Sequence, residues 1–367
     1  MKIAYLMHWN EGPESGVFKK VTAQMAEWIA LGHEVRLFLF TRRWKGEGHG
    51  GGEAVPADIP LVIQPYGKGL NRFAAFRMLL TRLEQWAPDA IYHRFDLYYA
   101  GLPRLLRRIP SILEINTNDL AEMRLGSRLR YLYHRLTRGL VLRSAGGFVF
   151  VSAEIGEEPH FKKYGQPREV IGNGFALSNA TPSPPPPSVR VRLIFIGTPG
   201  QPWHGVDEIA ALARLRPDWH FDMVGLQPED MVGGSAPRNM EFHGRLSRLD
   251  YEPLLRQADV AVGSLALYRN RMNEASPLKV REYLAYGLPV IIGYRDTDFP
   301  KGASFILELA NEAGSTAKGL QDIENFVRTW KGRRVPAGEV MHLDTAVKEA
   351  ARVRFMERIA RKGGDKP

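Results

Sequence analysis

The sequence predicts an α/β protein built from two doubly wound parallel sheets in tandem. The chain has 367 residues, more than the roughly 250–300 at which a single hydrophobic core stops growing, so two domains are expected. Short apolar runs alternate with helical patterns and show little polar alternation, which is typical of parallel strands covered on both faces. The proline-rich stretch SNATPSPPPPSV near the middle cannot continue a helix or a central strand.

Each apolar run defines one predicted strand. Before the proline-rich stretch the runs lie at 2–7, 34–40, 61–66, 90–95, 111–116, 147–152 and 169–171. After it they lie at 192–197, 220–225, 240–244, 259–264, 290–294 and 304–309. The predicted domains are therefore 1–178 and 190–342, joined by a linker at 179–189. A last helix is expected at 343–362, and the glycine-rich segment 46–53 is expected to be a surface loop.

Composition limits the class of protein. The chain contains no cysteine, which excludes disulfides and thiolate–zinc sites. No apolar run reaches the ~18–20 residues that a membrane span needs, and the N-terminus lacks the features of a signal peptide. We therefore expect the protein to lie in the cytoplasm.

The net charge of +10 is concentrated in the first half of the chain. The segment 123–144 contains no acidic residue and six arginines: Arg124, Arg128, Arg130, Arg135, Arg138 and Arg143. A basic helical segment suits an anionic membrane surface or nucleic acid. The alternative interpretation is an arginine-rich helix face that is simply solvated.

Two common phosphate-binding motifs are missing from the places where they would function. Neither the first strand of the chain nor the first strand after the linker is followed by Gly-x-Gly-x-x-Gly, and the Walker sequence does not occur. These observations disfavour nicotinamide and mononucleotide-kinase chemistry.

A different anion site is predicted in the segment NEASPLKVREYLAYGLPVI, residues 273–291. Ser276 is a suitable N-cap and Pro277 suits the first helical position, so a helix is expected from there until Gly287 ends it. The first-turn amides, near Leu278 and Lys279, lack intrahelical partners and form an anion site with the helix dipole. The ammonium of Lys279 adds a positive charge.

Two glutamates flank this predicted anion site. Glu282 lies on the helix, where its carboxylate can accept hydrogen bonds from two adjacent hydroxyls such as those of a ribose. Glu274 lies in the preceding loop and can accept from the hydroxyls of a second sugar. The order ribose, diphosphate, sugar predicts a nucleotide-sugar donor; the alternative is two surface glutamates with this spacing by accident.

The paired glutamates resemble the Glu-x7-Glu motif of the retaining GT-B glycosyltransferases of family 4 (glycosyl transferases group 1). Further segments resemble that family in the expected order: 15–38, 145–155, 171–177, 196–210 and 239–262. The resemblance implies the GT-B fold, with an N-terminal acceptor-binding domain, a C-terminal donor-binding domain, the site in the cleft between them, and a last helix that returns to the first domain. It also implies transfer of a sugar from a UDP- or GDP-linked donor with retention of configuration, without a cofactor or bound metal.

The resemblance assigns site residues and also shows two departures from the family pattern. An arginine and a lysine that usually contact the diphosphate are replaced by Thr198 and His204. A protonated His204, Lys279, Arg269 or Arg271 could supply the missing charge; otherwise activity is lowered or lost. We predict catalytic roles for Glu274, Lys279 and His204. The predicted donor contacts are Gly16, which allows close approach to the phosphates, with Thr198, Ser276, Pro277, Leu278 and Glu282.

Acceptor contacts are predicted where two strands of the first domain end. His93, Arg94, Glu114 and Asn116 lie there, although each could instead serve buried structural hydrogen bonding. The Asp-x-Asp sequence at 295–298 is interpreted as a surface turn, and the histidines show no metal-binding spacing, so no metal site is predicted.

The sequence therefore predicts a retaining hexosyltransferase that acts on a hydroxyl acceptor in cell-surface polysaccharide or glycolipid synthesis. Its expected partners are the nucleotide-sugar donor, a glycan or lipid-linked acceptor and the anionic inner face of the plasma membrane, and not nucleic acid. Two alternatives share the fold. One is a binding or scaffold subunit with weakened or lost catalysis, and the other is a sugar-nucleotide epimerase or phosphorylase.

Overall fold

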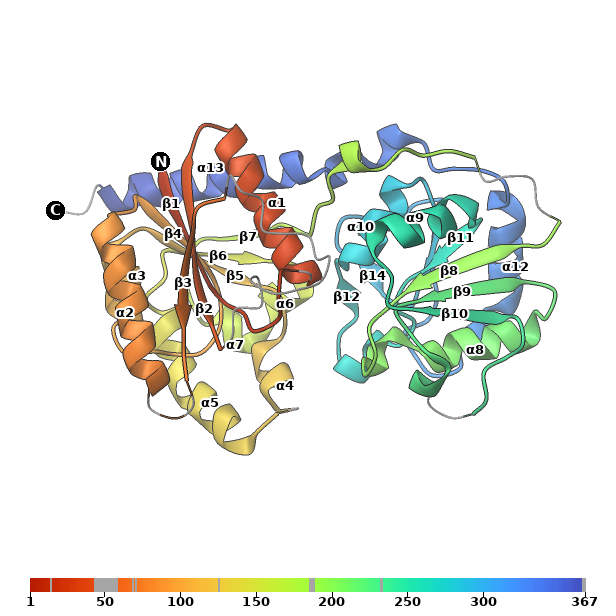
Figure 1. Ribbon diagram of the computed structural model, residues 1–367, viewed down its shortest axis with the longest axis horizontal. Coiled ribbons are helices and arrows are strands. Elements are labelled where there is room, and N and C mark those ends of the chain that lie inside the picture. The colour runs from red at the N-terminus through yellow and green to blue at the C-terminus, as the bar shows by residue number, and fades with distance from the viewer. Residues whose placement is uncertain are drawn as a thin grey trace. The chain divides into compact units, whose positions relative to one another are not determined.

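The computed structural model describes residues 1–13, 15–42, 59–67, 69, 71–124, 126–184, 189–231 and 234–364. It divides into two compact units, shown in Figure 1. Unit 1 comprises Met1–Gly172 together with the residues from Thr345 onward, and unit 2 comprises Asn173–Asp344. The predicted glycine-rich loop at 46–53 and residues 185–188 of the predicted linker lie outside the described residues.

The described part of unit 1 forms a seven-stranded parallel sheet with the order β3-β2-β1-β4-β5-β6-β7. Its strands are β1 (Lys2–His8), β2 (Glu34–Thr41), β3 (Leu61–Pro65), β4 (Ala90–Arg94), β5 (Ser111–Ile115), β6 (Gly147–Phe150) and β7 (Arg168–Val170). Its helices are α1 (Gly16–Ala30), α2 (Asn71–Trp86), α3 (Leu102–Arg108), α4 (Asp119–Arg124), α5 (Arg128–Leu142), α6 (Ala153–Glu157), α7 (Pro159–Lys162) and α13 (Thr345–Gly364).

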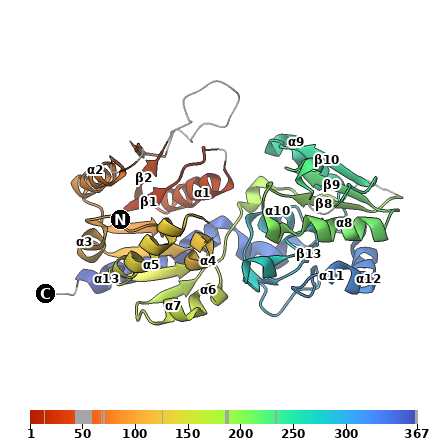
Figure 2. The ribbon, with the colours of Figure 1, turned by 90° about the horizontal axis from the view of Figure 1, so that it is seen from below.

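The last helix of the chain is part of unit 1. It packs on α1 and β5, and Figure 2 shows it beside this sheet. The indole Nε1 of Trp28 on α1 donates to Glu349 on α13 at 2.9 Å. A Cβ added at Gly147 would lie 2.8 Å from the ring of Phe355, so only glycine lets the helix approach β6 this closely.

The described part of unit 2 contains a six-stranded parallel sheet with the order β10-β9-β8-β11-β13-β15 and a two-stranded sheet β12-β14. The strands are β8 (Arg192–Ile196), β9 (His220–Val224), β10 (Met240–Gly244), β11 (Val260–Val262), β12 (Glu274–Ala275), β13 (Val290–Ile292), β14 (Arg295–Asp296) and β15 (Ile306–Glu308). The α-helices are α8 (Val206–Leu215), α9 (Arg248–Gln257), α10 (Leu278–Ala285), α11 (Ser315–Lys318) and α12 (Leu320–Trp330). The 3-10 turns are η1 (Leu177–Asn179), η2 (Pro202–His204), η3 (Pro228–Asp230), η4 (Leu267–Asn270) and η5 (Ala337–Leu343).

The predicted fold class is confirmed, since both large sheets are parallel and every predicted strand is present. The prediction works because these strands are apolar on both faces: in β1, Ile3–Met7 are all buried. Strands β12 and β14 were not predicted, because two-residue strands carry no periodicity. Among the described helices, none combines the length and the apolar character that crossing a membrane requires.

The start of the proline-rich stretch packs along unit 2. Ala180 is buried in the core of this unit, and Arg256 Nη1 donates to the carbonyl of Thr181 at 3.2 Å. Arg334 Nε donates to the carbonyl of Ser183 at 2.9 Å. Proline has no backbone N–H, so this stretch cannot join a regular hydrogen-bonded structure in which its carbonyl groups would find backbone donors. Here the side chains of two arginines donate to these carbonyls instead.

A fully buried arginine on α10 organises the loops around it. Arg281 donates to both carboxylate oxygens of Asp296 and to Asp298, each at 2.7 Å. It also donates to Ser276 Oγ at 2.8 Å and to the carbonyl of Asn173 at 3.2 Å. The interpretation of the Asp-x-Asp sequence as a surface turn is therefore wrong. Both carboxylates are buried, which is tolerated because the guanidinium neutralises them.

Replacing Arg281 with methionine should strongly destabilise unit 2. The change removes the guanidinium from a buried ion-pair network and takes away the buried counter-charge of Asp296, which costs roughly 3–5 kcal/mol. Urea unfolding followed by tryptophan fluorescence measures the loss. The matched control is Arg108→Met, which breaks an exposed pair with Glu84 and should change stability by less than about 1 kcal/mol. Equal losses of stability in the two variants would contradict the stabilising role of the buried Arg281 ion pairs.

Candidate functional site

The candidate anion site of unit 2 lies at the start of α10. The helix begins at Leu278, and Pro277 takes the N-cap position without a side-chain capping bond. The first-turn amides of Leu278 and Lys279 have no intrahelical acceptor, as in every α-helix. The prediction that Ser276 is the N-cap is wrong, because Ser276 lies one residue farther from the helix.

Ser276 supports the loop from within the protein. Its hydroxyl accepts from the amide of Asn173 and from Arg281, both at 2.8 Å, and its carbonyl accepts from the side-chain amide of Asn173. Only 4% of the residue is exposed. Its oxygens are engaged by protein groups, which gives Ser276 a supporting role in the loop, and its predicted contact with a ligand stays a prediction. The ligand contacts predicted for Pro277 and Leu278 stay predictions.

Lys279 places an ammonium group in an apolar environment. Its Nζ is buried and, among the described residues, has no hydrogen-bond partner. It lies 4.2 Å from the centroid of the Phe195 ring, at the end of β8. Burial lowers the pKa of Lys279 to about 7. A buried cation without an anionic partner is costly, so this position is suited to receive an anion.

His204 lies beside this lysine. Its ring packs edge-on against Phe195 at 5.4 Å, and its Nδ1 has no hydrogen-bond partner among the described residues. Burial, together with the charge of Lys279, lowers the pKa of His204 to about 2. The imidazole is therefore neutral near pH 7, and the expectation that a protonated His204 supplies positive charge is not met here. The structure does bring His204 and Lys279 together.

The backbone approaches itself closely where β8 and β9 end. Gly225 has a φ of +84°, and a Cβ there would lie 2.0 Å from the carbonyl oxygen of Gly197. Only glycine is compatible with this contact and this backbone conformation. Thr198 follows Gly197 and is exposed, at the carboxyl end of a parallel strand, where ligands bind in such sheets.

The two glutamates of the predicted motif occupy different elements. Glu282 lies on α10, where it accepts from the hydroxyl of Tyr251 at 2.9 Å, with Arg248 Nε at 3.8 Å. Glu274 is partly buried in the short strand β12, opposite Arg295 of β14. Arg269, one of the arginines considered as a substitute cation, is held by Asp207 through two hydrogen bonds of 2.9 and 2.7 Å.

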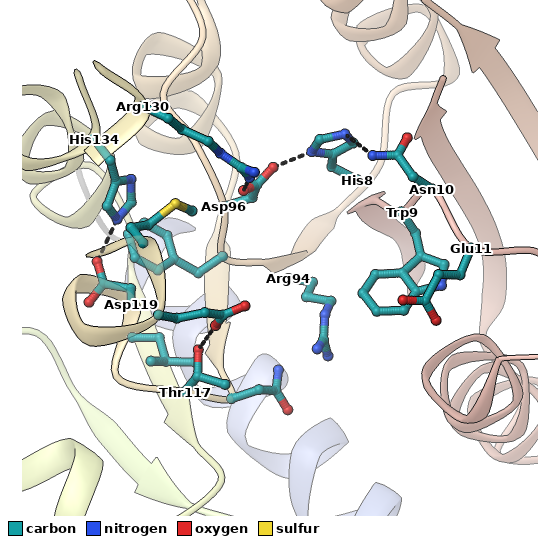
Figure 3. A pocket seen from close by; sticks show the side chains of 15 residues that line it. His8, Trp9, Asn10, Glu11, Arg94, Asp96, Thr117, Asp119, Arg130 and His134 are labelled. Atoms are coloured by element: carbon teal, nitrogen blue, oxygen red, sulfur yellow. Dashed lines mark hydrogen bonds and ion pairs between the residues drawn. The ribbon is translucent and has the colours of Figure 1, made fainter. Parts of the chain in front are cut away.

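Unit 1 contains a cavity of about 310 Å³ at the carboxyl ends of β1, β4 and β5 (Figure 3). Of the predicted acceptor residues, Arg94 and Asn116 line it. Glu114 lies behind them and accepts from Lys20 at 3.0 Å and from Asn116 at 3.0 Å. Burial raises the pKa of Glu114, but the Lys20, Arg352 and Arg94 charges outweigh it and hold the pKa well below its usual range.

The remaining predicted residues of unit 1 do not line the cavity. His93 is buried within the sheet, and its Nδ1 hydrogen-bonds to the carbonyl of Leu6 at 3.0 Å. Gly16 is the exposed first residue of α1, and its predicted contact with donor phosphates stays a prediction.

The sequence reasoning missed a histidine–aspartate pair in this cavity. His8, the last residue of β1, hydrogen-bonds through Nδ1 to Asp96, and its Nε2 lies 2.7 Å from the hydroxyl of Tyr66. Burial raises the pKa of Asp96, but the hydrogen bond and charge of His8 and the charge of Arg130 outweigh it and lower the pKa to about 2. The sequence signal that could have indicated this pair was His8 itself, a polar residue at the end of a buried apolar strand.

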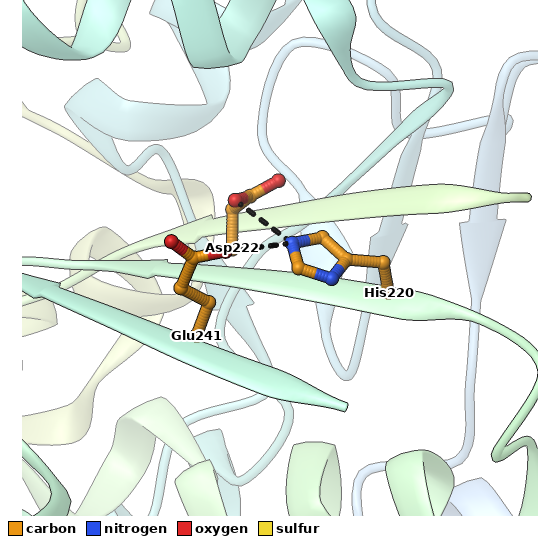
Figure 4. A group of neighbouring side chains, drawn as sticks. All are labelled: His220, Asp222 and Glu241. Carbon is orange, nitrogen blue, oxygen red and sulfur yellow. Dashed lines mark hydrogen bonds and ion pairs between the residues drawn. The ribbon is translucent and has the colours of Figure 1, made fainter. Parts of the chain in front are cut away.

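A cluster on the sheet of unit 2 resembles a metal site but is internally neutralised. His220, Asp222 and Glu241 place ligand atoms within 4.8 Å of one another (Figure 4). Asp222 already accepts from Arg192 at 3.0 and 3.1 Å and from His243 at 2.9 Å. Since the guanidinium balances this buried carboxylate, we interpret the cluster as a structural ion network.

Comparisons with known families match both halves of the chain. Residues 15–174 match the profile described as "Glycosyl transferase 4-like domain", and residues 190–317 match the profile "Glycosyl transferases group 1". Among curated proteins, no sequence match is found.

Solved structures of glycosyltransferases share the fold over nearly the whole chain. A sucrose-phosphate synthase from Thermosynechococcus elongatus has a TM-score of 0.64 at 15% identity and covers 99% of this chain and 97% of its own. HepE of Anabaena, solved with UDP and glucose, has a TM-score of 0.64 at 16% identity, covering 98% and 100%. WaaG, described as a glycosyltransferase of lipopolysaccharide biosynthesis, has a TM-score of 0.59 at 16% identity, covering 99% and 98%.

The unusual pKa of Lys279 predicts a pH-dependent affinity for nucleoside diphosphates. Above pH 7 the free protein loses the Lys279 proton, whereas a bound diphosphate favours the ammonium, so the affinity for UDP or GDP should fall by up to about tenfold per pH unit between pH 7 and 9. Calorimetry in buffers of different ionisation enthalpy should detect uptake of nearly one proton on binding at pH 8.

Two variants make this test specific to Lys279. Lys279→Met should bind the diphosphate weakly, with an affinity that no longer falls over this pH range and without proton uptake. Lys301→Met removes an exposed lysine of the same unit and should behave like the unaltered protein. Binding that is independent of pH in the unaltered protein would refute the role of Lys279.

Proposed function

The chain belongs, in both of its halves, to glycosyltransferase domain families of the GT-B fold, and on that premise we propose that it is a retaining, metal-independent hexosyltransferase. The proposed donor is a UDP- or GDP-linked sugar, bound by unit 2, and the proposed acceptor is a hydroxyl group of a glycan or lipid-linked saccharide, bound by unit 1. No cofactor takes part.

The observation that carries this proposal is the buried Lys279 ammonium at the first turn of α10. It has no hydrogen-bond partner among the described residues, and its pKa is lowered to about 7 by burial. A diphosphate would supply the missing negative charge and accept hydrogen bonds from the adjacent helix amides. The unpartnered Nδ1 of the neutral His204 is a further polar group available to this ligand.

The donor's sugars are assigned to the flanking glutamates. Glu282 is fixed by Tyr251 and by the nearby Arg248, so its carboxylate is oriented before a ribose arrives. Glu274 is fixed in β12 by pairing with β14 and is assigned to the transferred sugar. HepE, which was solved with UDP and glucose, supports a donor of this class.

In the proposed mechanism, the leaving diphosphate gathers negative charge as its bond to the sugar breaks. The ammonium of Lys279 and the α10 amides stabilise that charge, which makes preorganised electrostatics the main catalytic contribution. The diphosphate oxygen takes the acceptor proton, so the acceptor attacks the face from which the diphosphate departs and configuration is retained. No protein nucleophile is assigned. The acidic pair Asp296 and Asp298 is engaged by Arg281, which supports a role for it in folding rather than in metal binding.

The acceptor proposal rests on the cavity of unit 1. Arg94 and Asn116 provide hydrogen-bond donors there, and Glu114 holds both, accepting from Asn116 at 3.0 Å and lying 3.6 Å from Arg94 Nη1. WaaG acts in lipopolysaccharide biosynthesis, and by analogy we assign this protein to cell-surface polysaccharide or glycolipid synthesis, at the inner face of the plasma membrane.

The second candidate function is a binding or scaffold subunit, or an epimerase of the same fold. It is favoured by Thr198 and by the neutral state of His204, which leave fewer cations for a diphosphate than the family pattern provides. A scaffold should bind neither UDP nor GDP, and an epimerase should isomerise the donor sugar when no acceptor is present.

The overall proposal predicts transfer with retention. Incubated with UDP- and GDP-linked hexoses and a lipid-linked saccharide acceptor, the protein should release nucleoside diphosphate only when the acceptor is present, and without added metal. The anomeric proton coupling of the product, measured by NMR, should match that of the donor. A product of inverted configuration would reject the proposed mechanism.

Glu282 and Lys279, both on α10, should affect different kinetic parameters. Glu282→Gln should raise KM for the donor about tenfold or more with a smaller change in kcat, because it removes hydrogen bonds made in ground and transition states alike. Lys279→Met should lower kcat by about a hundredfold or more, because the charge it stabilises develops in the transition state. Glu241→Gln, at an exposed carboxylate of the same unit, is the matched control and should change neither parameter. Normal kcat for Lys279→Met would contradict its catalytic role.

A further inference from the structure

The outer face of α5 exposes a row of large apolar side chains. Leu129 and Leu136 are 80% and 73% exposed, and Leu132 and Leu140 are 51% and 44% exposed. We call these four residues the leucine face. Single exposed leucines are ordinary on protein surfaces, but an aligned row on one helix is not.

Helix geometry places the four leucines in a narrow stripe. At about 100° per residue, positions 129, 132, 136 and 140 fall within an arc of roughly 80°. The buried residues of α5 lie on the opposite side: His134, Arg138, Val141 and Leu142. The usual arrangement is therefore altered, since the face packed on unit 1 combines polar with apolar side chains and the exposed face carries a row of leucines. Figures 1 and 2 show α5 at the surface of unit 1.

Basic residues surround the leucine face. Of the arginines noted in this segment, Arg138 is buried and bonded to Asp119, but the others are exposed: Arg124, Arg128, Arg130, Arg135 and Arg143. No acidic residue occurs between Glu122 and Glu154. Apolar anchors bordered by cations, on a helix without acidic residues, are complementary to an anionic bilayer, where leucines enter the acyl region and arginines contact the headgroups. Such a surface matches a neutral or basic protein partner poorly.

The same helix also forms a wall of the cavity in unit 1. Arg130 and His134 line that cavity together with Met123 and Glu122 of α4. His134 points inward because Asp119 accepts its Nε2–H at 2.6 Å. A molecule whose polar head occupies the cavity could therefore keep its apolar part near the surface that carries the leucines.

The geometry points to α5 as an interfacial helix: its leucine face inserts into an anionic membrane and holds unit 1 where a membrane-resident, amphipathic acceptor presents its head group to the cavity. The acceptor part of this inference rests on the proposed transferase function, whereas membrane insertion rests on α5 alone. Binding that depended only on arginines would need no leucines at these positions.

Vesicle flotation tests the inference with the full-length protein. The protein should float with vesicles of phosphatidylcholine mixed with phosphatidylglycerol, and much less with phosphatidylcholine alone. Leu129→Ser combined with Leu136→Ser should lower the fraction bound to the anionic vesicles about tenfold or more. Leu249→Ser is the matched control, because Leu249 on α9 is also 80% exposed but lies in unit 2, and it should bind like the unaltered protein.

Two results would overturn the inference. One is unchanged vesicle binding by the double leucine variant. The other is self-association that depends on these leucines in sedimentation velocity without any vesicle binding, which would assign the face to a second copy of the chain. Circular dichroism and UDP or GDP binding are measured on the same preparations. Loss of nucleotide binding with intact vesicle binding would count against the transferase proposal and leave the membrane contact standing.

Discussion

The buried guanidinium of Arg281 is the interaction on which the candidate donor site depends. It bonds two carboxylates that follow β13, the hydroxyl ahead of α10 and the carbonyl of Asn173 at the start of unit 2. These partners come from segments far apart in the sequence, and none of them could be buried with its charge or hydrogen-bonding capacity unsatisfied. Because Arg281 lies two residues after Lys279 on the same helix, anchoring it also fixes the backbone position from which Lys279 projects.

Two lysines with buried ammonium groups, Lys20 in unit 1 and Lys279 in unit 2, show how a structural lysine differs from a candidate ligand-binding one. Lys20 in unit 1 donates to Glu114 at 3.0 Å and to Asn116 at 3.1 Å, so its charge is balanced within the protein. Burial lowers its pKa only to about 8, since Glu114 opposes the shift. Among the described residues Lys279 Nζ has no hydrogen-bond partner; it lies over the Phe195 ring, and its charge acts on the neutral His204. The difference lies in the missing counter-charge and not in the depth of burial.

Sequence patterns were sufficient for the sheets and insufficient for the polar networks. The strands could be predicted because each is a continuous apolar run, and that pattern depends only on local sequence. The positions of Lys279 and Glu282 on one helix followed equally from local signals. The burial of Asp296, the supporting role of Ser276 and the pairing of His8 with Asp96 could not be predicted, because each depends on a partner distant in the chain. The resemblance to a family gave the residue types of a site but not their charge states, and the neutral His204 is the clearest example.

Helix α5 also has two faces with different roles: buried hydrogen bonds hold its inner face on unit 1, and its outer face exposes the leucines. Asp119 on α4 accepts hydrogen bonds from His134 at 2.6 Å and from Arg138 at 2.6 and 2.9 Å, and these bonds fix the inner face of the helix. Burial raises the pKa of Asp119, but these partners and His160 outweigh it, so the carboxylate stays charged and the anchor persists. A helix held this firmly can expose several leucines without rotating to bury them, because rotation would break the buried charged network. The leucine face is therefore maintained against the hydrophobic effect by electrostatics on the opposite side of the same helix.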